Sequence, residues 1–285
     1  MGHEESKLKI AVLGAGALGC AMGSCLSEAR HDVWLINRRA DQVEAMNQHG
    51  LRVRINGVDR SIPVKASRNA QEIAAQTGTV DLIVVLVKSF HTQEAITSAT
   101  AIVGPDTVVL SLQNGLGHED VLADVVGRDK VLAGKTYAGG VMLAPGHIIR
   151  GTEGKETYIG ELDGRLTDRV QRMAQVFNDA GLITHISDNI MGTMWEKLLV
   201  NVATGALSGI THLTYGDLYQ VPEVKACALA AVQEAIDVAK ASGIALSVTD
   251  PEQAWSKAAA GLPPEFKASM LQSLEKGSIT EVDYV

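Results

Sequence analysis

A glycine-rich turn near the N-terminus constrains the fold of this chain more than any other feature. The turn follows a short apolar run, Lys9–Leu13, and precedes a predicted helix over residues 17–29. A second apolar run, Asp32–Ile36, comes next, so strand, turn, helix and strand follow one another within roughly 30 residues. This order predicts a βαβ unit, in which a helix joins two parallel strands by a right-handed crossover.

The glycine spacing in this turn is G-x-G-x-x-G, which indicates a dinucleotide-binding loop. Gly14 permits a tight turn, Gly16 lets the backbone approach a pyrophosphate, and Gly19 allows helix and strand to pack closely. The phosphates are then expected at the helix N-terminus, where backbone N–H groups favour negative charge. The residues expected to contact the cofactor are Gly14, Ala15, Gly16, Ala17, Leu18 and Gly19.

The segment after the second predicted strand indicates which dinucleotide binds. NAD-binding domains carry an acidic residue about 20 residues after the loop, where it binds the ribose hydroxyls. Here the sequence is Asn37-Arg38-Arg39. No carboxylate stands at this strand end to repel a 2′-phosphate, and a guanidinium can bind one through paired hydrogen bonds. The sequence therefore predicts NADPH/NADP as the cofactor.

The rest of the chain divides into two parts with different patterns. Residues 82–87 and 107–112 are continuous apolar runs, typical of parallel strands buried on both faces. Residues 136–161 are rich in glycine and β-forming residues and predict paired strands. Helical periodicity follows. We predict an α/β fold with an N-terminal Rossmann-type domain over residues 1–187 and a C-terminal all-helical domain over residues 188–285.

Polar residues follow both apolar runs directly. Lys88 comes after residues 82–87, and Gln113-Asn114-Gly115 comes after residues 107–112. Ligands of open α/β sheets bind at the carboxyl ends of the strands. We therefore expect Lys88 and Asn114 beside the cofactor.

The first helix of the helical domain, predicted over residues 188–207, carries a lysine and an asparagine on one face. Lys197 and Asn201 lie one helical turn apart. Hydride reduction of a ketone leaves negative charge on oxygen, which an ammonium group can stabilise and protonate while an amide positions the substrate. The apolar stripe predicted to face the core consists of Met191, Met194, Trp195, Leu198 and Val202.

Several segments together resemble the ketopantoate reductase (2-dehydropantoate 2-reductase) family. They occur in the family's order and cover nearly the whole chain. They are residues Gly14 to Gly19, Leu86-Val87-Lys88, Gln113-Asn114-Gly115-Leu116-Gly117, Trp195-Glu196-Lys197-Leu198-Leu199-Val200-Asn201, Ser269-Met270-Leu271-Gln272 and Thr280-Glu281-Val282-Asp283-Tyr284.

The resemblance implies an activity and a role for each matching residue. It implies reduction of ketopantoate to pantoate with NADPH, a step of pantothenate biosynthesis. Lys197 resembles the family's catalytic general acid, and Arg38 resembles its 2′-phosphate partner. Lys88 and Asn114 resemble residues that hold the cofactor. The residues that resemble substrate-binding positions are Asn114, Asn201, Ser269 and Glu281.

The chain departs from the family pattern at two positions. Enzymes specific for ketopantoate carry two further substrate-binding asparagines in the helical domain, and the matching positions here are Gly205 and Tyr215. The loss of one hydrogen bond to a small acid costs on the order of 1 kcal/mol. The reaction type survives this change, whereas the identity of the acid stays open. The chain ends at Val285, where family members continue into a further helix.

Composition excludes several classes of partner. The formal net charge of −8 argues against a general binder of nucleic acid or of anionic membranes. The polar first nine residues lack the apolar segment of a signal peptide, and no apolar run is long enough to span a bilayer, so we expect a cytoplasmic protein. The cysteines show no metal-binding spacing, so no metal is expected. The apolar helices leave room for a homodimer.

Two other functions stay open at this point. A 3-hydroxy acid dehydrogenase also joins a Rossmann domain to a helical domain with a lysine and an asparagine one turn apart, although the segments around Gln113 and Glu281 disfavour it. A non-catalytic NADPH-binding sensor needs the glycine loop but not Lys197.

Overall fold

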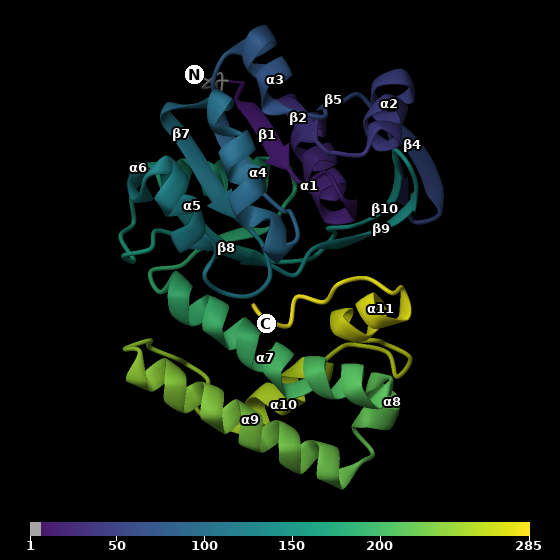
Figure 1. Cartoon of the computed structure of the whole chain (residues 1–285), viewed down its shortest axis with the longest axis vertical. Coiled ribbons are helices and arrows are strands. Elements are labelled where there is room, and N and C mark those ends of the chain that lie inside the picture. The colour runs from purple at the N-terminus through teal and green to yellow at the C-terminus, as the bar shows by residue number, and fades with distance from the viewer. Residues whose placement is uncertain (1–6) are drawn as a thin grey trace. The chain divides into compact units, whose positions relative to one another are not determined.

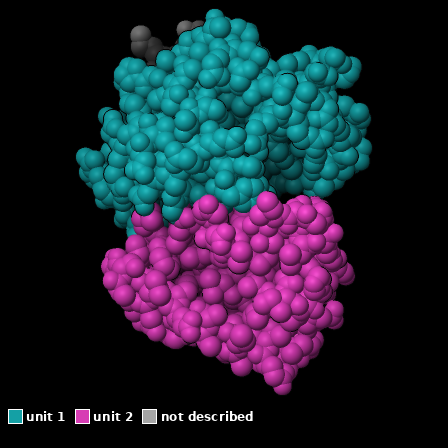
Figure 2. Space-filling view, in the orientation of Figure 1, with its two compact units in different colours: residues 1–113, 117–190 teal, residues 114–116, 191–285 magenta. Residues whose placement is uncertain are grey.

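The structure, a computed structural model, describes residues 7–285 and divides into two compact units (Figures 1 and 2). The first unit comprises residues 7–113 and Gly117–Ile190, and the second comprises Asn114–Leu116 and Met191–Val285. The sequence assigned residues 114–116 to the first domain, whereas they pack with the second unit. Residues 1–6, which belong to the polar N-terminus discussed above, lie outside the described residues.

The first unit is built on an eight-stranded sheet. All neighbouring strands run parallel except β8 (Val131–Thr136) and β11 (Thr157–Gly160), which are antiparallel to each other. This is the Rossmann-type sheet predicted from the sequence. The strand order is β12 (Thr184–Ile186), β11 (Thr157–Gly160), β8 (Val131–Thr136), β7 (Val103–Ser111), β6 (Val80–Val85), β1 (Lys9–Leu13), β2 (Asp32–Ile36) and β5 (Lys65–Ser67).

Helices cover both faces of this sheet because its central strands are apolar on both sides. In β1, Ile10 and Val12 pack into one hydrophobic cluster, and Ala11 and Leu13 pack into another. The first cluster is completed by α1 (Ala17–Glu28) and α6 (Asp168–Asp179). The second is completed by α3 (Ala70–Thr77), α4 (Thr92–Ser98) and α5 (His118–Val126).

A second, four-stranded sheet packs on α1 (Figure 1). Its order is β4 (Val58–Ile62), β3 (Leu51–Ile55), β10 (His147–Gly151) and β9 (Gly139–Ala144). The sequence predicted paired strands across residues 136–161, and β9 and β10 do pair with each other. The last strand of that region, β11, pairs instead with β8 of the large sheet. The helix α2 (Ala40–His49) packs against β3 and β5.

The register of the large sheet aligns the carboxyl ends of five strands. Leu13 pairs with Ile36 on one side and with Val85 on the other. Ile36 in turn pairs with Ser67, and Val85 pairs with Ser111. The segments that follow these residues therefore leave the sheet along one edge, and the chain crosses to the other side of β1 there. This is the position where open α/β sheets bind ligands.

The second unit is helical, as predicted. Leu199 and Ala203 of its longest helix are fully buried, whereas Trp195 and Leu198 of the predicted stripe are only partly buried. The buried face is thus rotated slightly from the prediction, toward the core formed with α9 (Pro222–Ala241) and α10 (Pro251–Ala259). Within residues 7–285 no helix is both long and apolar enough to cross a membrane. The helices are α7 (Ile190–Thr211), α8 (Tyr215–Leu218), α9 (Pro222–Ala241), α10 (Pro251–Ala259) and α11 (Ser269–Glu275).

A buried carboxyl group in the first unit makes the stability depend on pH. Glu119 lies in the first turn of α5 with 3% of its surface exposed, and burial raises its pKa from 4.5 to about 7. Between these values the folded chain binds more protons than the unfolded chain, so stability falls as the pH rises. Glu119→Gln should be more stable than the parent protein at pH 8, by up to about 3 kcal/mol, and nearly equal to it near pH 4.5.

Urea unfolding at several pH values measures this difference. The exposed carboxylate of Glu44 on α2 offers a matched control, Glu44→Gln, which removes the same charge without changing a buried group. Identical profiles for the parent and Glu119→Gln would contradict the prediction.

Candidate functional site

Two of the three glycines in the loop after β1 are required by their surroundings. Gly14 has a φ of +108°, and a Cβ there would lie 2.6 Å from the carbonyl carbon of Leu86. A Cβ on Gly19 would overlap the backbone of Gly14 and lie 3.2 Å from Cγ1 of Val12, so the helix packs closely on β1. By contrast, a Cβ on Gly16 would meet no atom within 4 Å. The backbone at Gly16 is therefore open to a ligand.

The start of α1 suits an anion. The N–H groups of Gly14 and Ala15 donate to the carbonyl of Ile36, and that of Gly16 donates to Gly14. Gly16 is the N-cap residue, and residues 17–28 of the helix carry no acidic side chain in their first turn. The first helical N–H groups therefore face no competing carboxylate of this helix. These features fit the pyrophosphate of a dinucleotide.

The arginines after β2 are paired with acidic side chains. Nη1 of Arg38 lies 3.0 Å from a carboxylate oxygen of Glu94 on α4, and Nη2 lies 2.9 Å from Nε2 of His91. Arg39 forms an ion pair with Asp41 at 2.5 Å. The sequence showed that the end of β2 lacks a carboxylate, but it missed Glu94. No local signal could have revealed it, because α4 is brought to Arg38 only by the sheet order.

Gln113 joins the loops that follow β6 and β7. Its Nε2 donates to the carbonyl of Val87 at 3.0 Å and to Oγ1 of Thr92 at 2.8 Å. The strand β6 ends at Val85, so Lys88 does not follow the strand directly as predicted. Instead it follows Val87, whose carbonyl Gln113 holds. The sequence singled out Gln113 only as part of a motif, whereas the structure shows that its amide is a structural link.

In the second unit the structure joins two of the predicted site residues directly. Nζ of Lys197, on α7, donates to Oδ1 of Asn114 at 2.7 Å. Asn201 lies one turn further along the same helix. Because an ammonium group has only donors, the amide oxygen of Asn114 is a suitable partner for its charged form. The pairing fixes where the ammonium of Lys197 lies.

The turn that carries Glu281 packs on the residues that follow Asn114. Gly115 has a φ of +88°, and a Cβ there would overlap the carbonyl oxygen of Tyr284. That same oxygen accepts a hydrogen bond from the N–H of Leu116 at 3.2 Å. The N–H of Tyr284 donates to the carbonyl of Glu281 at 2.9 Å and closes the turn. The C-terminal motif thus lies next to the segment whose amide holds Lys197.

Ser269 is placed by the packing of α11 on α7. It is the first residue of α11, and the next residue, Met270, contacts Gly209 of α7. Gly209 lies one turn beyond Gly205, which in turn lies one turn beyond Asn201. The structure therefore brings Ser269 near the continuation of the helix face that carries Lys197 and Asn201.

The two positions that depart from the family pattern behave differently. Tyr215 is buried with 7% of its surface exposed, and its hydroxyl lies 2.8 Å from Oγ1 of Thr204. Its ring packs on Phe266, which makes it a core residue of the second unit. A Cβ on Gly205 would meet no atom within 4 Å. Gly205 therefore leaves open space on α7. Tyr215, in contrast, packs in the core and does not take the place of a substrate-binding asparagine.

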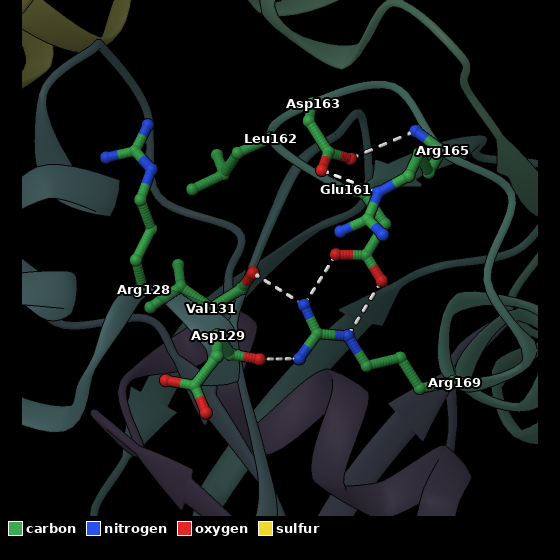
Figure 3. Close-up of a pocket in the computed structure, with 8 residues that line it drawn as sticks. All are labelled: Arg128, Asp129, Val131, Glu161, Leu162, Asp163, Arg165 and Arg169. Atoms are coloured by element: carbon green, nitrogen blue, oxygen red, sulfur yellow. Dashed lines mark hydrogen bonds and ion pairs between the residues drawn. The ribbon is translucent and has the colours of Figure 1, made fainter.

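A hollow on the first unit is lined by charged side chains that pair with one another (Figure 3). Arg169 donates to both carboxylate oxygens of Glu161, at 2.7 and 2.5 Å, and to the carbonyl of Asp129. Arg165 pairs with Asp163 at 2.7 Å. These charges neutralise one another and tie α6 to the start of β8, so the hollow offers no net charge to a ligand.

The chain matches known families and structures along most of its length. Residues 10–164 match the family described as ketopantoate reductase PanE/ApbA, and residues 189–285 match its C-terminal domain. A 2-dehydropantoate 2-reductase of Pyrococcus abyssi is 34% identical over 98% of this chain and 88% of its own. One from Halobacterium salinarum is 33% identical over 97% of this chain and 89% of its own.

Solved structures share the fold. A PanE/ApbA family ketopantoate reductase from Ralstonia eutropha JMP134 superposes with a TM-score of 0.86 at 34% identity, covering 97% of this chain and 88% of that one. A D-mandelate dehydrogenase solved with NADH and anilino(oxo)acetate superposes with a TM-score of 0.88 at 26% identity, covering 98% and 89%. The chain therefore belongs to the ketopantoate reductase family and is an oxidoreductase that acts on a CH–OH group.

Proposed function

We propose that this protein reduces a 2-oxo acid with NADPH, with ketopantoate as the first candidate substrate and pantoate as its product. The observation that carries the proposal is the hydrogen bond from Nζ of Lys197 to Oδ1 of Asn114. It holds a proton donor in a fixed place on α7, as a general acid requires. A cofactor-binding sensor has no need of this pairing. The cytoplasmic location and the homodimer expected from the sequence remain predictions.

Lys197 acts as the general acid in this proposal. The nicotinamide cofactor supplies a hydride when it is bound. As negative charge develops on the carbonyl oxygen of the substrate, the ammonium of Lys197 stabilises it and transfers a proton to that oxygen, after which water reprotonates the amine. Asn114 orients the ammonium, and Asn201 positions the substrate beside it. Ser269 and Glu281 bind its other polar groups, which accords with their resemblance to the family's substrate-binding residues.

In this proposal the cofactor binds at the carboxyl edge of the sheet. The N-terminus of α1 holds the pyrophosphate, and Arg38 binds the 2′-phosphate. Lys88, fixed through Val87 and Gln113, supports the same cofactor. The guanidinium of Arg38 is 62% exposed and its pair with Glu94 is equally solvated, so the pair is weak and a doubly charged phosphate can displace the carboxylate. NADPH is therefore the preferred cofactor.

Gly205 favours a second candidate substrate class, 2-oxo acids with a bulkier substituent than that of ketopantoate. It leaves space on the helix face of Lys197 where ketopantoate-specific enzymes have an asparagine. The similarity to D-mandelate dehydrogenase agrees with such a substrate, because mandelate is an aromatic 2-hydroxy acid. A 3-hydroxy acid dehydrogenase has less support, since the match extends over both domains of the ketopantoate reductase family.

Lys197→Ala tests the general acid. Removing the proton donor should lower kcat by roughly 100-fold or more with every accepted 2-oxo acid. The dissociation constant of NADPH should stay nearly unchanged, because Lys197 lies outside the glycine loop and the arginine segment. Steady-state NADPH oxidation and calorimetry measure the two quantities. Lys240→Ala, at an exposed lysine of α9, is the matched control. Full activity of Lys197→Ala would rule out the proposed role.

Glu94→Gln tests the competition for Arg38. Loss of the carboxylate should tighten NADPH binding by up to about fivefold at low salt, because an exposed ion pair contributes at most about 1 kcal/mol. Affinity for NADH, which has no 2′-phosphate, should not change. Fluorescence titration of both cofactors gives the ratio, with Glu44→Gln as a control of equal charge change. An equal gain for both cofactors would show that Arg38 does not meet the 2′-phosphate.

Gly205→Asn tests the substrate class. An added amide should raise kcat/KM for ketopantoate by roughly tenfold, in line with one additional hydrogen bond. It should lower kcat/KM for phenylglyoxylate, the 2-oxo acid that corresponds to mandelate, because the asparagine side chain takes up the open space beside Gly205. Gly205→Ala controls for the gain in helix propensity without adding a polar group. If both substrates respond alike to Gly205→Asn, then Gly205 does not contribute to substrate choice.

A further inference from the structure

The side chain of Asn37 contacts two segments that the proposed function assigns to two different parts of the cofactor. Its Nδ2 donates to the carbonyl of Ala15, in the glycine loop, at 2.7 Å. Its Oδ1 accepts from the N–H of Arg39 at 3.0 Å. One amide thus bridges the pyrophosphate loop and the arginine segment, which the sequence separates by more than twenty positions.

We propose that Asn37 is a positioning residue that holds the glycine loop and the arginine segment together as one preassembled surface for the cofactor. The inference rests on the proposed function in one respect: it takes the arginine segment as the site of a 2′-phosphate. The link itself involves the pyrophosphate loop, which NADPH and NADH share, so its effect on NADH binding can be tested separately.

The orientation of the Ala15 carbonyl determines the conformation of the glycine loop. Ala15 is fully buried, and its carbonyl oxygen belongs to the same peptide group as the N–H of Gly16. That N–H donates to Gly14 at 2.8 Å. The orientation of this single peptide plane therefore sets the position of Gly16, which has open space where a Cβ would lie. Fixing the carbonyl fixes the surface that the pyrophosphate meets.

Asn37 is the principal partner of this carbonyl. The other groups that approach it are Nε2 of Gln42 and Sγ of Cys20, and both lie at 3.5 Å. A distance of 3.5 Å is long for an N–H···O hydrogen bond, and a thiol is a weak donor, whereas the 2.7 Å contact of Asn37 is short. When a buried carbonyl loses its hydrogen-bond partner, the equilibrium constant that favours its native orientation falls by on the order of tenfold to one hundredfold. The glycine loop therefore depends on the amide of Asn37 more than on either neighbour.

The other half of the amide orders the arginine segment. The N–H of Asn37 donates to the carbonyl of Ser67 at 3.1 Å, so Asn37 itself is anchored to β5. Nε of Arg68, the next residue, donates to the carbonyl of Arg38 at 3.3 Å. Because Oδ1 of Asn37 accepts from the N–H of Arg39, the peptide group that joins Arg38 to Arg39 is held at both its carbonyl and its N–H. Its guanidinium therefore starts from a fixed backbone.

An amide is needed because the two contacts have opposite polarity. One contact requires a donor and the other an acceptor, and asparagine supplies both from one planar group. Aspartate has nearly the same shape and keeps the acceptor for Arg39, but it sets a carboxylate against the carbonyl of Ala15. Asn37→Asp therefore removes the donor half alone, and Asn37→Ala removes both halves.

The experiment measures dissociation constants of NADPH and NADH for the full chain and for Asn37→Ala, Asn37→Asp, Arg38→Ala and the double variant Asn37→Ala/Arg38→Ala. Asn37→Ala should weaken both cofactors by on the order of tenfold. Arg38→Ala should weaken NADPH only. In the double variant the loss of NADPH affinity should be smaller than the product of the two single losses, because the arginine segment has already lost its anchor. Asn37→Asp should weaken the binding of both cofactors because the donor is lost, and that of NADPH further because the new carboxylate also repels the 2′-phosphate.

A second readout needs no cofactor. Backbone amides of residues 14–19 should exchange with deuterium faster in Asn37→Ala than in the parent protein. The matched control is Asn47→Ala. Asn47 also bridges backbone groups, accepting from the N–H and donating to the carbonyl of Ala66, each at 2.9 Å, but it does not contact the glycine loop. Asn47→Ala should lower the melting temperature while leaving both dissociation constants unchanged.

The outcomes separate three claims: the cofactor preference, the bridge made by Asn37 and the coupling of the two segments. If the parent protein binds NADH as tightly as NADPH, the cofactor preference is wrong, while weaker NADH binding by Asn37→Ala still supports the bridge. Unchanged dissociation constants together with unchanged exchange of residues 14–19 overturn the bridge. Strictly multiplicative losses of NADPH affinity in the double variant overturn the coupling of the two segments. If Asn37→Ala does not fold, Asn37→Asp, which keeps the acceptor, is judged by the same criteria.

Discussion

The close approach of α1 to β1 is the constraint on which the first unit depends. Gly14 lies against the backbone of Leu86, and Gly19 lies against the backbone of Gly14, so neither position has room for a Cβ. These contacts bring the positive end of the helix to the carboxyl edge of the sheet, at the place where the chain crosses from one side of β1 to the other. Because the packing is tight, the positive end of α1, its first backbone N–H groups and the open space at Gly16 lie together at this edge.

At the carboxyl edge of the sheet, hydrogen bonds and exposed charges have different roles. The pair between Arg38 and Glu94 is solvated on both sides, which keeps it weak and exchangeable. The amides of Asn37 and Gln113 instead bind backbone carbonyls at least partly shielded from water, where a lost partner has a larger cost. The amides therefore hold the loops in shape, while the arginine charge stays available for an anion.

The second unit positions its chemistry by contacts that are distant in the sequence. Lys197 and Asn114 are separated by 83 positions, yet their side chains form a 2.7 Å hydrogen bond. The turn at Glu281 packs on Gly115 and Leu116, the two residues after Asn114. Three of the segments that resemble the family's motifs thus come together in one compact unit, although one of them follows a strand of the sheet in the first unit.

Local patterns in the sequence determined the βαβ start, the glycine loop, the helical second half and the family. The first three follow from interactions between near neighbours, namely the spacing of apolar residues and the conformational freedom of glycine, whereas the family follows from the matching segments. Tertiary structure alone decided that Glu94 meets Arg38, that Asn37 bridges two loops, that β11 pairs antiparallel with β8, and that Asn114 packs with Lys197. Those contacts depend on strand order and register, which bring together residues that no local pattern relates.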